Sequence, residues 1–207
     1  MRTRIDYLAD KYSFTELNES PRLRQQWQDV LEECRQTEAG PEERLRIALL
    51  NVDYVTSFEL PFRLLLTRTP QLITALREEW GISQKNVVFN DKRFGCVYSL
   101  KASLSGVPDT YRYHLSHRIR RVVGNENTSL PYQQVAREMK APRERLKYAL
   151  EAGLLVSALD GLFWFGSQRI AADVLRLRKA GMPVVTTTVE VHDNLTGTTR
   201  KVPAYHL

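Results

Sequence analysis

The chain has 207 residues, of which 43% are hydrophobic and 26% are charged, and this composition argues against global disorder. Its two cysteines are too few for a disulfide framework or a zinc cluster, and no apolar run reaches the roughly 18 residues of a membrane span. We therefore expect a soluble, cytoplasmic protein with no membrane association.

The net charge of +6 is concentrated in the middle of the sequence. Residues 111–147 hold nine Lys and Arg against three Glu, a surplus equal to that of the whole chain. Residues 1–42 instead hold six basic and nine acidic residues. A polyanion is the expected partner of the basic segment, although cations that only solvate helix faces would produce the same pattern.

The sequence contains an internal repeat with an offset of 101 residues. Residues 41–77 align with residues 142–178 without a gap, and 11 of the 37 pairs are identical. Average composition would give about two identities by chance, so a duplicated module is predicted. The identical pairs are Pro41/Pro142, Glu43/Glu144, Arg44/Arg145, Leu45/Leu146, Ala48/Ala149, Leu49/Leu150, Val55/Val156, Phe62/Phe163, Arg68/Arg169, Leu76/Leu177 and Arg77/Arg178.

The first 40 residues are predicted to form a helical N-terminal extension. Ser20 and Pro21 are typical of a helix start, and an apolar stripe follows at Leu23, Trp27, Leu31 and Cys34. This helix would close the first module or pair two subunits, so a homodimer is one expected state.

The first module is expected over residues 41–102. Pro41 opens one helix, Pro61 starts a short second helix, and Thr67 or Thr69 caps a third helix that ends before Gly81. A β-hairpin then follows, with a turn over residues 90–95 that carries Lys92 and Arg93.

Residues 103–141 are predicted to be a basic helical connector with helices over 109–123 and 131–139. The apolar stripe of the first of these helices leaves its basic face, which includes Arg118, Arg120 and Arg121, free to meet DNA phosphates. His114 and His117 are spaced to hold a metal, but the absence of a third ligand nearby favours surface histidines.

The second module, residues 142–207, shows the same order of signals more clearly. Pro142 opens a helix that stops at Gly153, and a short apolar helix over 159–165 follows. Ser167 can cap a third helix, and beyond Gly181 the apolar period changes from 3.6 to 2, which predicts a hairpin with its turn over 192–199. Three helices and a hairpin predict a winged helix-turn-helix.

Five short segments of the second module occur in a characteristic order and spacing. They are Leu159-Asp160, Phe165-Gly166, Arg169-Ile170-Ala171-Ala172, Leu177-Arg178-Lys179-Ala180-Gly181 and Ala204-Tyr205-His206-Leu207. In these segments, residues 144–207 resemble the small winged helix-turn-helix domains of bacteriophage, prophage and plasmid proteins, and the resemblance implies DNA binding. Asp173 departs from the family pattern where a basic or neutral residue would face phosphate, and Gly161 and Trp164 are poor helix formers.

DNA recognition by such a module needs a helix that presents polar side chains to the major groove and a wing that contacts the backbone. In the second module the first turn of the reading helix suits base contacts, with arginine for guanine and glutamine for adenine. The predicted DNA-binding residues of this module are Ser167, Gln168, Arg169, Arg176 and Lys179 on the helix, and Arg200 and Lys201 on the wing. Their equivalents in the first module are Arg68, Thr69, Gln71 and Thr74, with Lys92 and Arg93 on the wing.

A second interpretation assigns the reading helix differently. Residues 130–140 and 142–153 would form the helix-turn-helix, residues 154–165 would be its wing, and Arg143, Arg145 and Lys147 would contact DNA. The two interpretations differ in whether residues 159–165 are helical or extended.

No phosphate loop, nucleophile elbow or metal-ligand cluster is recognisable, so we expect neither enzymatic activity nor a cofactor. We expect a sequence-specific double-stranded DNA-binding protein, a transcriptional regulator of a phage, plasmid or other mobile element. The alternatives are a DNA-binding subunit of a larger replication, partition or phage-defence assembly, and a winged-helix protein-interaction scaffold.

Overall fold

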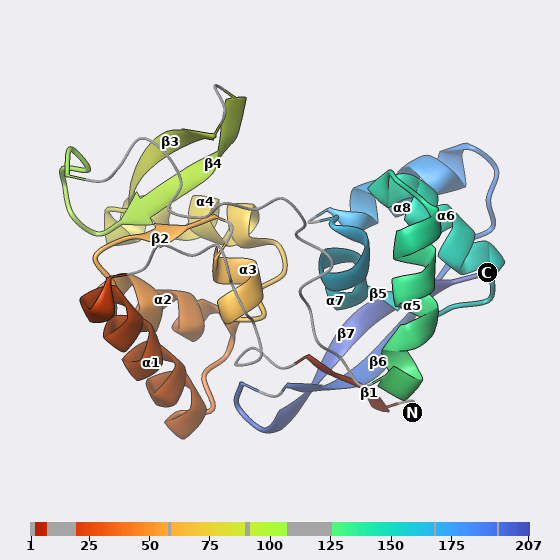
Figure 1. Ribbon diagram of the computed structural model, residues 1–207, viewed down its shortest axis with the longest axis horizontal. Helices are drawn as coiled ribbons and strands as arrows, with labels where there is room; N and C mark the ends of the chain where they lie inside the picture. The colour runs from red at the N-terminus through yellow and green to blue at the C-terminus, as the bar shows by residue number, and fades with distance from the viewer. Residues whose placement is uncertain are drawn as a thin grey trace. The chain divides into compact units, whose positions relative to one another are not determined.

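The computed structural model describes residues 3–7, 20–57, 59–89, 92–106, 126–167, 169–193 and 195–207. The chain is an α+β protein, as the sequence predicts, and it divides into two compact units (Figure 1). The first unit is Tyr12–Ser116, and the second unit comprises Met1–Lys11 and His117–Leu207. In the described part of the chain, no helix combines the length and the apolar character that crossing a membrane requires.

In its described residues, the first unit has four helices and a three-stranded antiparallel sheet. The sheet has the order β2-β4-β3, with Val55 opposite Tyr98 and Ser83 opposite Ser99. Its elements are α1 (Pro21–Gln36), α2 (Pro41–Asn51), β2 (Val55–Thr56), α3 (Glu59–Arg63), α4 (Thr69–Trp80), β3 (Ser83–Phe89) and β4 (Lys92–Ser99).

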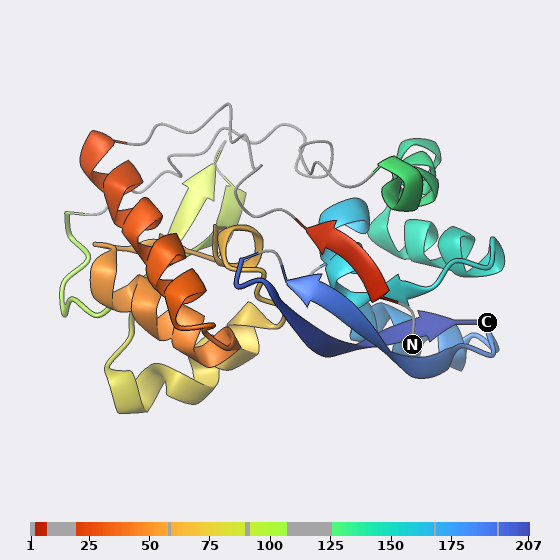
Figure 2. The same ribbon diagram turned by 90° about the horizontal axis from the view of Figure 1, so that it is seen from below.

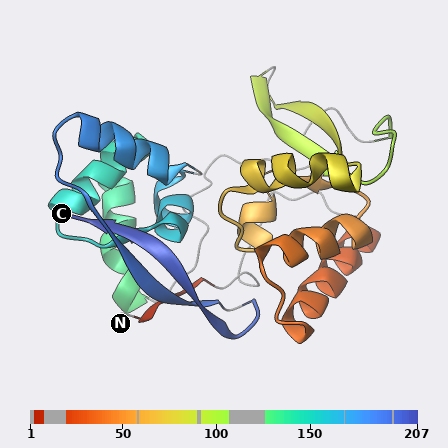
Figure 3. The ribbon, with the colours of Figure 1, turned by 180° about the vertical axis from the view of Figure 1, so that it is seen from behind.

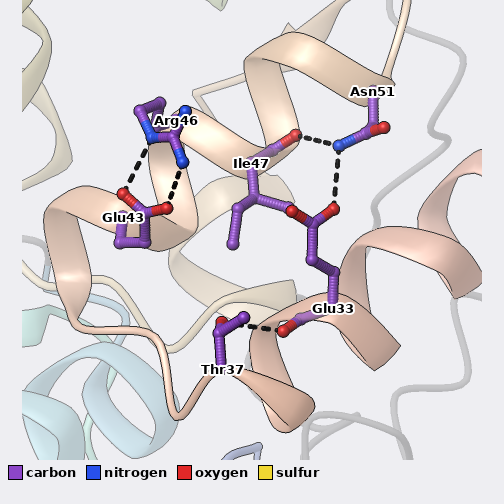
Figure 4. A network of polar contacts seen from close by, with 6 residues as sticks. All are labelled: Glu33, Thr37, Glu43, Arg46, Ile47 and Asn51. Carbon is purple, nitrogen blue, oxygen red and sulfur yellow. Dashed lines mark hydrogen bonds and ion pairs between the residues drawn. The ribbon is translucent and has the colours of Figure 1, made fainter.

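Helix α1 begins as predicted, because the Ser20 side chain accepts a hydrogen bond from the Leu23 amide at 3.2 Å. Its buried stripe contains Trp27, Cys34 and Val30, whereas the predicted Leu31 is only half-buried. Figure 4 shows how α1 is joined to α2: the Asn51 side chain donates to Glu33 Oε2 at 3.2 Å and to the Ile47 carbonyl at 2.9 Å.

Three local predictions in this unit need correction. Helix α3 starts at Glu59 rather than at Pro61, because Thr56 and Glu59 form a reciprocal cap with bonds of 3.0 Å in both directions. Arg68, in the left-handed region at φ 62°, precedes α4, and no side chain caps this helix. Lys92 lies in strand β4 opposite Phe89, so it is not part of the turn.

The second unit contains a four-stranded sheet of order β1-β6-β7-β5. Strands β5, β7 and β6 are antiparallel, and β1 adds to β6 in parallel, with Thr3 opposite Glu190 (Figure 2). Its elements are β1 (Thr3–Tyr7), α5 (Glu126–Glu138), α6 (Pro142–Glu151), β5 (Val156–Ser157), α7 (Ala158–Asp160), the π-helix η3 (Gly161–Phe165), α8 (Ile170–Lys179), β6 (Val185–Asp193) and β7 (Thr198–His206).

The unit boundaries differ from those expected. Residues 1–40 do not form one extension, since residues 1–11 cluster with the second unit while α1 packs on α2 in the first. Helix α5 packs on α6 and η3, so it belongs to the second unit rather than to a connector. The helix expected over 109–123 lies outside the described residues.

Residues 158–165 are helical, as α7 and η3. This contradicts the second interpretation, in which residues 154–165 form a wing. The structure also explains Gly161, which is a poor helix former: a Cβ at this position would lie 2.5 Å from the Cδ1 of Ile170, so glycine lets α8 approach η3 closely.

Both units share one order of elements: two helices, a short strand, a short helical segment, a longer helix and a hairpin (Figure 3). The cap at Thr56 and Glu59 recurs 101 residues later, where Ser157 and Asp160 bond reciprocally at 2.8 and 3.2 Å. Leu65 (φ 52°) likewise corresponds to Gly166 (φ 75°), and both lie in the left-handed region before the longer helix.

Candidate nucleic-acid interface

An open depression of about 500 Å³ lies at the N-terminal ends of α6 and α8 in the second unit. Arg143 borders it from α6, while Arg169 and Arg176 border it from the start and the middle of α8. Three guanidinium groups and two helix N-termini therefore meet at one place on the surface. Helix N-termini carry unpaired amide groups and a partial positive charge, so this depression favours an anion.

The loop before α8 is shaped by Gly166 and Ser167. Gly166 ends η3 in the left-handed conformation, and the Ser167 hydroxyl then accepts a hydrogen bond from the Arg169 amide at 3.3 Å. The same hydroxyl donates to Asp173 Oδ2 at 3.0 Å. Ser167 is buried, lines the depression and shapes this loop through both hydrogen bonds, so its hydroxyl is used within the loop.

Asp173 is the acid at the predicted phosphate-facing position of α8, and its partners explain its presence. It accepts the Ser167 hydrogen bond through one oxygen and forms an ion pair with Arg176 at 3.4 Å through the other. Its side chain is 15% exposed, whereas that of Arg176 is 64% exposed. Asp173 thus braces the first turn of α8 and holds Arg176 at the depression.

The remaining charges leave a positive excess at this surface. Glu144 is occupied by a hydrogen bond from the Ala141 amide at 3.2 Å. Within the described ranges, no hydrogen bond or ion pair engages the guanidinium of Arg143 or of Arg169, and both residues are exposed. Since unpaired arginines at helix N-termini are a common way to bind phosphate, these two residues are the core of the candidate site.

The outward face of α8 continues from the depression. Ala172, Leu175, Arg176 and Lys179 fall at positions i, i+3, i+4 and i+7, and all are exposed. The opposite face, with Ile170, Val174 and Leu177, is buried as predicted. Leu175 was not among the predicted site residues, although its place outside the buried stripe was the signal that it faces outward.

Arg145 has a different role from its neighbour Arg143. Its Nε donates to the Met139 carbonyl at 2.8 Å and its Nη1 donates to the Phe165 carbonyl at 3.1 Å. Arg44 in the first unit does the same with Ala39 and Leu64, at 2.7 and 3.1 Å. The identical arginine of the repeat is therefore a structural clamp, and the two nitrogens of Arg145 that make these bonds are used inside the fold rather than at the surface.

The hairpin of the second unit also needs one correction. Arg200 forms an ion pair at 3.5 Å with Asp193, whose side chain is fully buried, and this pairing occupies the guanidinium within the hairpin. Arg200 therefore is not a free phosphate contact. Lys201 is exposed on β7, and Lys147 on α6 is exposed but forms an ion pair with Glu151 at 3.7 Å.

The corresponding surface of the first unit is not basic. Thr69 is buried and its hydroxyl donates to the Leu66 carbonyl at 3.5 Å, so this hydroxyl is used inside the fold, while Arg68 and Gln71 are exposed. At the repeat offset, Glu42 stands in place of Arg143 and Glu78 in place of Lys179. At these two repeat positions the second unit therefore carries cations and the first unit carries acids.

Several predicted residues cannot be placed in the site. Gln168, Arg118, Arg120, Arg121, His114 and His117 lie outside the described residues. Lys92 and Arg93 belong to β4, but only their backbone is described. Over the ranges that the structure describes, no group of three or more His, Cys, Asp or Glu side chains is placed to hold a metal ion.

Comparison of the chain with models of protein families, with curated proteins and with solved structures gave no match.

Proposed function

We propose that the chain is a sequence-specific double-stranded DNA-binding protein built from two winged helix-turn-helix modules, with α8 as the helix that enters the major groove. The order of a helix, a short strand, two helices and a hairpin supports this assignment. The resemblance of residues 144–207 to phage and plasmid domains favours a transcriptional regulator of a mobile element.

The depression at α6 and α8 carries the proposal. A helix that enters the major groove brings its first turn close to both the base edges and the flanking phosphates. Arg169 at the N-cap of α8 and Arg143 on the neighbouring helix both border this depression. We assign the reading of a base edge to Arg169 and the contact with a phosphate to Arg143. Both guanidinium groups are available for such contacts, as described above.

We assign DNA reading to the second unit. Phosphate repels the carboxylates of Glu42 and Glu78, which occupy the first-unit positions equivalent to Arg143 and Lys179. The acids at these two repeat positions favour a protein partner for the first unit. They are the observation behind the second candidate function, a DNA-binding subunit of a larger assembly.

The test is a binding measurement on the full chain with a duplex enriched from a random library by the protein, and with the unselected library. Arg169→Ala is expected to cost about 1–3 kcal/mol on the enriched duplex and much less on random DNA, because a bidentate guanine contact is lost. Arg143→Ala is expected to weaken both duplexes alike and to lower the salt slope by about one unit.

Arg68→Ala is the matched control, because Arg68 occupies the same repeat position in the first unit and is also exposed. Its DNA affinity is expected to equal that of the unmodified protein. If the full chain binds no duplex at low salt, or if Arg68→Ala and Arg169→Ala have equal effects, the assignment is wrong.

A further inference from the structure

The outward stripe of α8 combines two kinds of side chain. Arg176 and Lys179 are cationic, whereas Ala172 and Leu175 are apolar. Leu175 is 53% exposed although it lies in the middle of the helix. Its counterpart in the first unit is the polar, exposed residue Thr74, so the repeat does not require an apolar side chain here.

In the major groove of duplex DNA, the apolar feature is the C5 methyl group of thymine. A leucine on a helix that carries cations on the same stripe matches that environment, because phosphates flank the groove and methyl groups project into it. The small side chain of Ala172, one turn before Arg176, allows the helix to approach the base edges closely.

We propose that Leu175 is a specificity-determining residue that recognises the methyl group of thymine in the DNA site. This inference rests on the proposed function and adds one base to it: Arg169 reads a guanine near the start of α8, and Leu175 reads a thymine further along the same helix. Arg169 is the N-cap of α8 and Leu175 follows six residues later, so the two side chains are expected to contact different base pairs of the site.

The experiment replaces each thymidine of the enriched duplex by deoxyuridine, one position at a time, and measures the affinity of the full chain by fluorescence anisotropy. Deoxyuridine keeps the base pair and removes only the methyl group. At one or two positions, replacing thymidine by deoxyuridine is expected to weaken binding of the unmodified protein by about fourfold. This is the effect expected when one buried methyl group is removed from an apolar contact. Leu175→Ala is expected to bind the thymidine duplex correspondingly more weakly and to be insensitive to deoxyuridine at the same positions.

Leu50→Ala is the matched control, since Leu50 is an exposed leucine of similar exposure, 59%, at the end of α2 in the other unit. It is expected to keep the sensitivity to deoxyuridine, and all variants are expected to melt as the unmodified protein does. Duplex binding that ignores every methyl group, or a Leu175→Ala variant that remains sensitive, overturns this inference alone. Absence of binding to any duplex overturns the proposed function and the inference together.

Discussion

The arginine that both halves of the repeat share gives the sharpest test of the structure. Arg44 is 2% exposed and donates two hydrogen bonds to the carbonyls of Ala39 and Leu64. Arg44→Met keeps most of the apolar stem but removes both donors and leaves two carbonyls unpaired. Hydrogen bonds from a charged group contribute about 1.5–3 kcal/mol each, so we expect a loss of about 3–5 kcal/mol in the free energy of unfolding of the first unit.

Arg145→Met removes the equivalent two bonds from the second unit, where the side chain is only half-buried. Water can replace part of the lost bonding, so the expected loss is smaller, about 1–3 kcal/mol. Hydrogen–deuterium exchange of peptides from α2 and α6, measured across a urea titration, reports the two units separately.

The adjacent residue Arg143 supplies the control for function. Arg143→Ala is expected to leave stability within about 0.5 kcal/mol, because its side chain is exposed. The two variants are expected to have the opposite effects on DNA affinity: Arg143→Ala weakens DNA binding, whereas folded Arg145→Met does not. If Arg145→Met leaves stability unchanged while it lowers DNA affinity, the clamp is refuted and Arg145 returns to the DNA surface.

The remaining predictions concern close packing, backbone conformation and pH. Gly161→Ala is expected to destabilise the second unit by about 1–3 kcal/mol in urea unfolding, since the new Cβ clashes with Ile170. Gly166→Ala is expected to cost about 1–2 kcal/mol in the same assay, because φ 75° strains any residue with a Cβ. The hydrogen bond from Lys101 lowers the pKa of Asp53. The ionised Asp53 side chain therefore stabilises the first unit at neutral pH, and this stabilisation is lost as pH falls through the lowered pKa. Lys101→Met is expected to make the free energy of unfolding of the first unit depend less steeply on pH in the acid range.

Each of these has a clear contrary outcome. Gly40→Ala is the control for the two glycine variants, because its φ is −72° and nothing lies within 4 Å of a Cβ there. If Gly161→Ala is as harmless as Gly40→Ala, α8 does not pack closely on η3. For Asp53, the same acid-range pH dependence of the free energy of unfolding with and without Lys101 would show that the ion pair does not persist in solution.

Much of the local structure was predictable because its causes are local. Pro41 and Pro142 mark helix starts, Gly81 and Gly181 follow helix ends, and the change of apolar period after Gly181 marks a strand. The helix predicted over residues 159–165 is also present, as α7 and η3. The cations of the candidate site at Arg143, Arg169 and Arg176 were also visible in the sequence.

What the sequence could not determine was which of these polar residues face solvent and which are used inside the fold. Arg143 and Arg145 look equivalent in sequence, yet only Arg145 reaches carbonyls 6 and 20 residues away. The pairing of Arg200 with Asp193, and of β1 with β6, depends in the same way on segments brought together by folding. By itself the sequence determined where helices, turns and the repeat lie, because these follow from spacing along the chain. Only the tertiary structure decided which arginines are used inside the fold, because burial and long-range carbonyl partners arise once the units are packed.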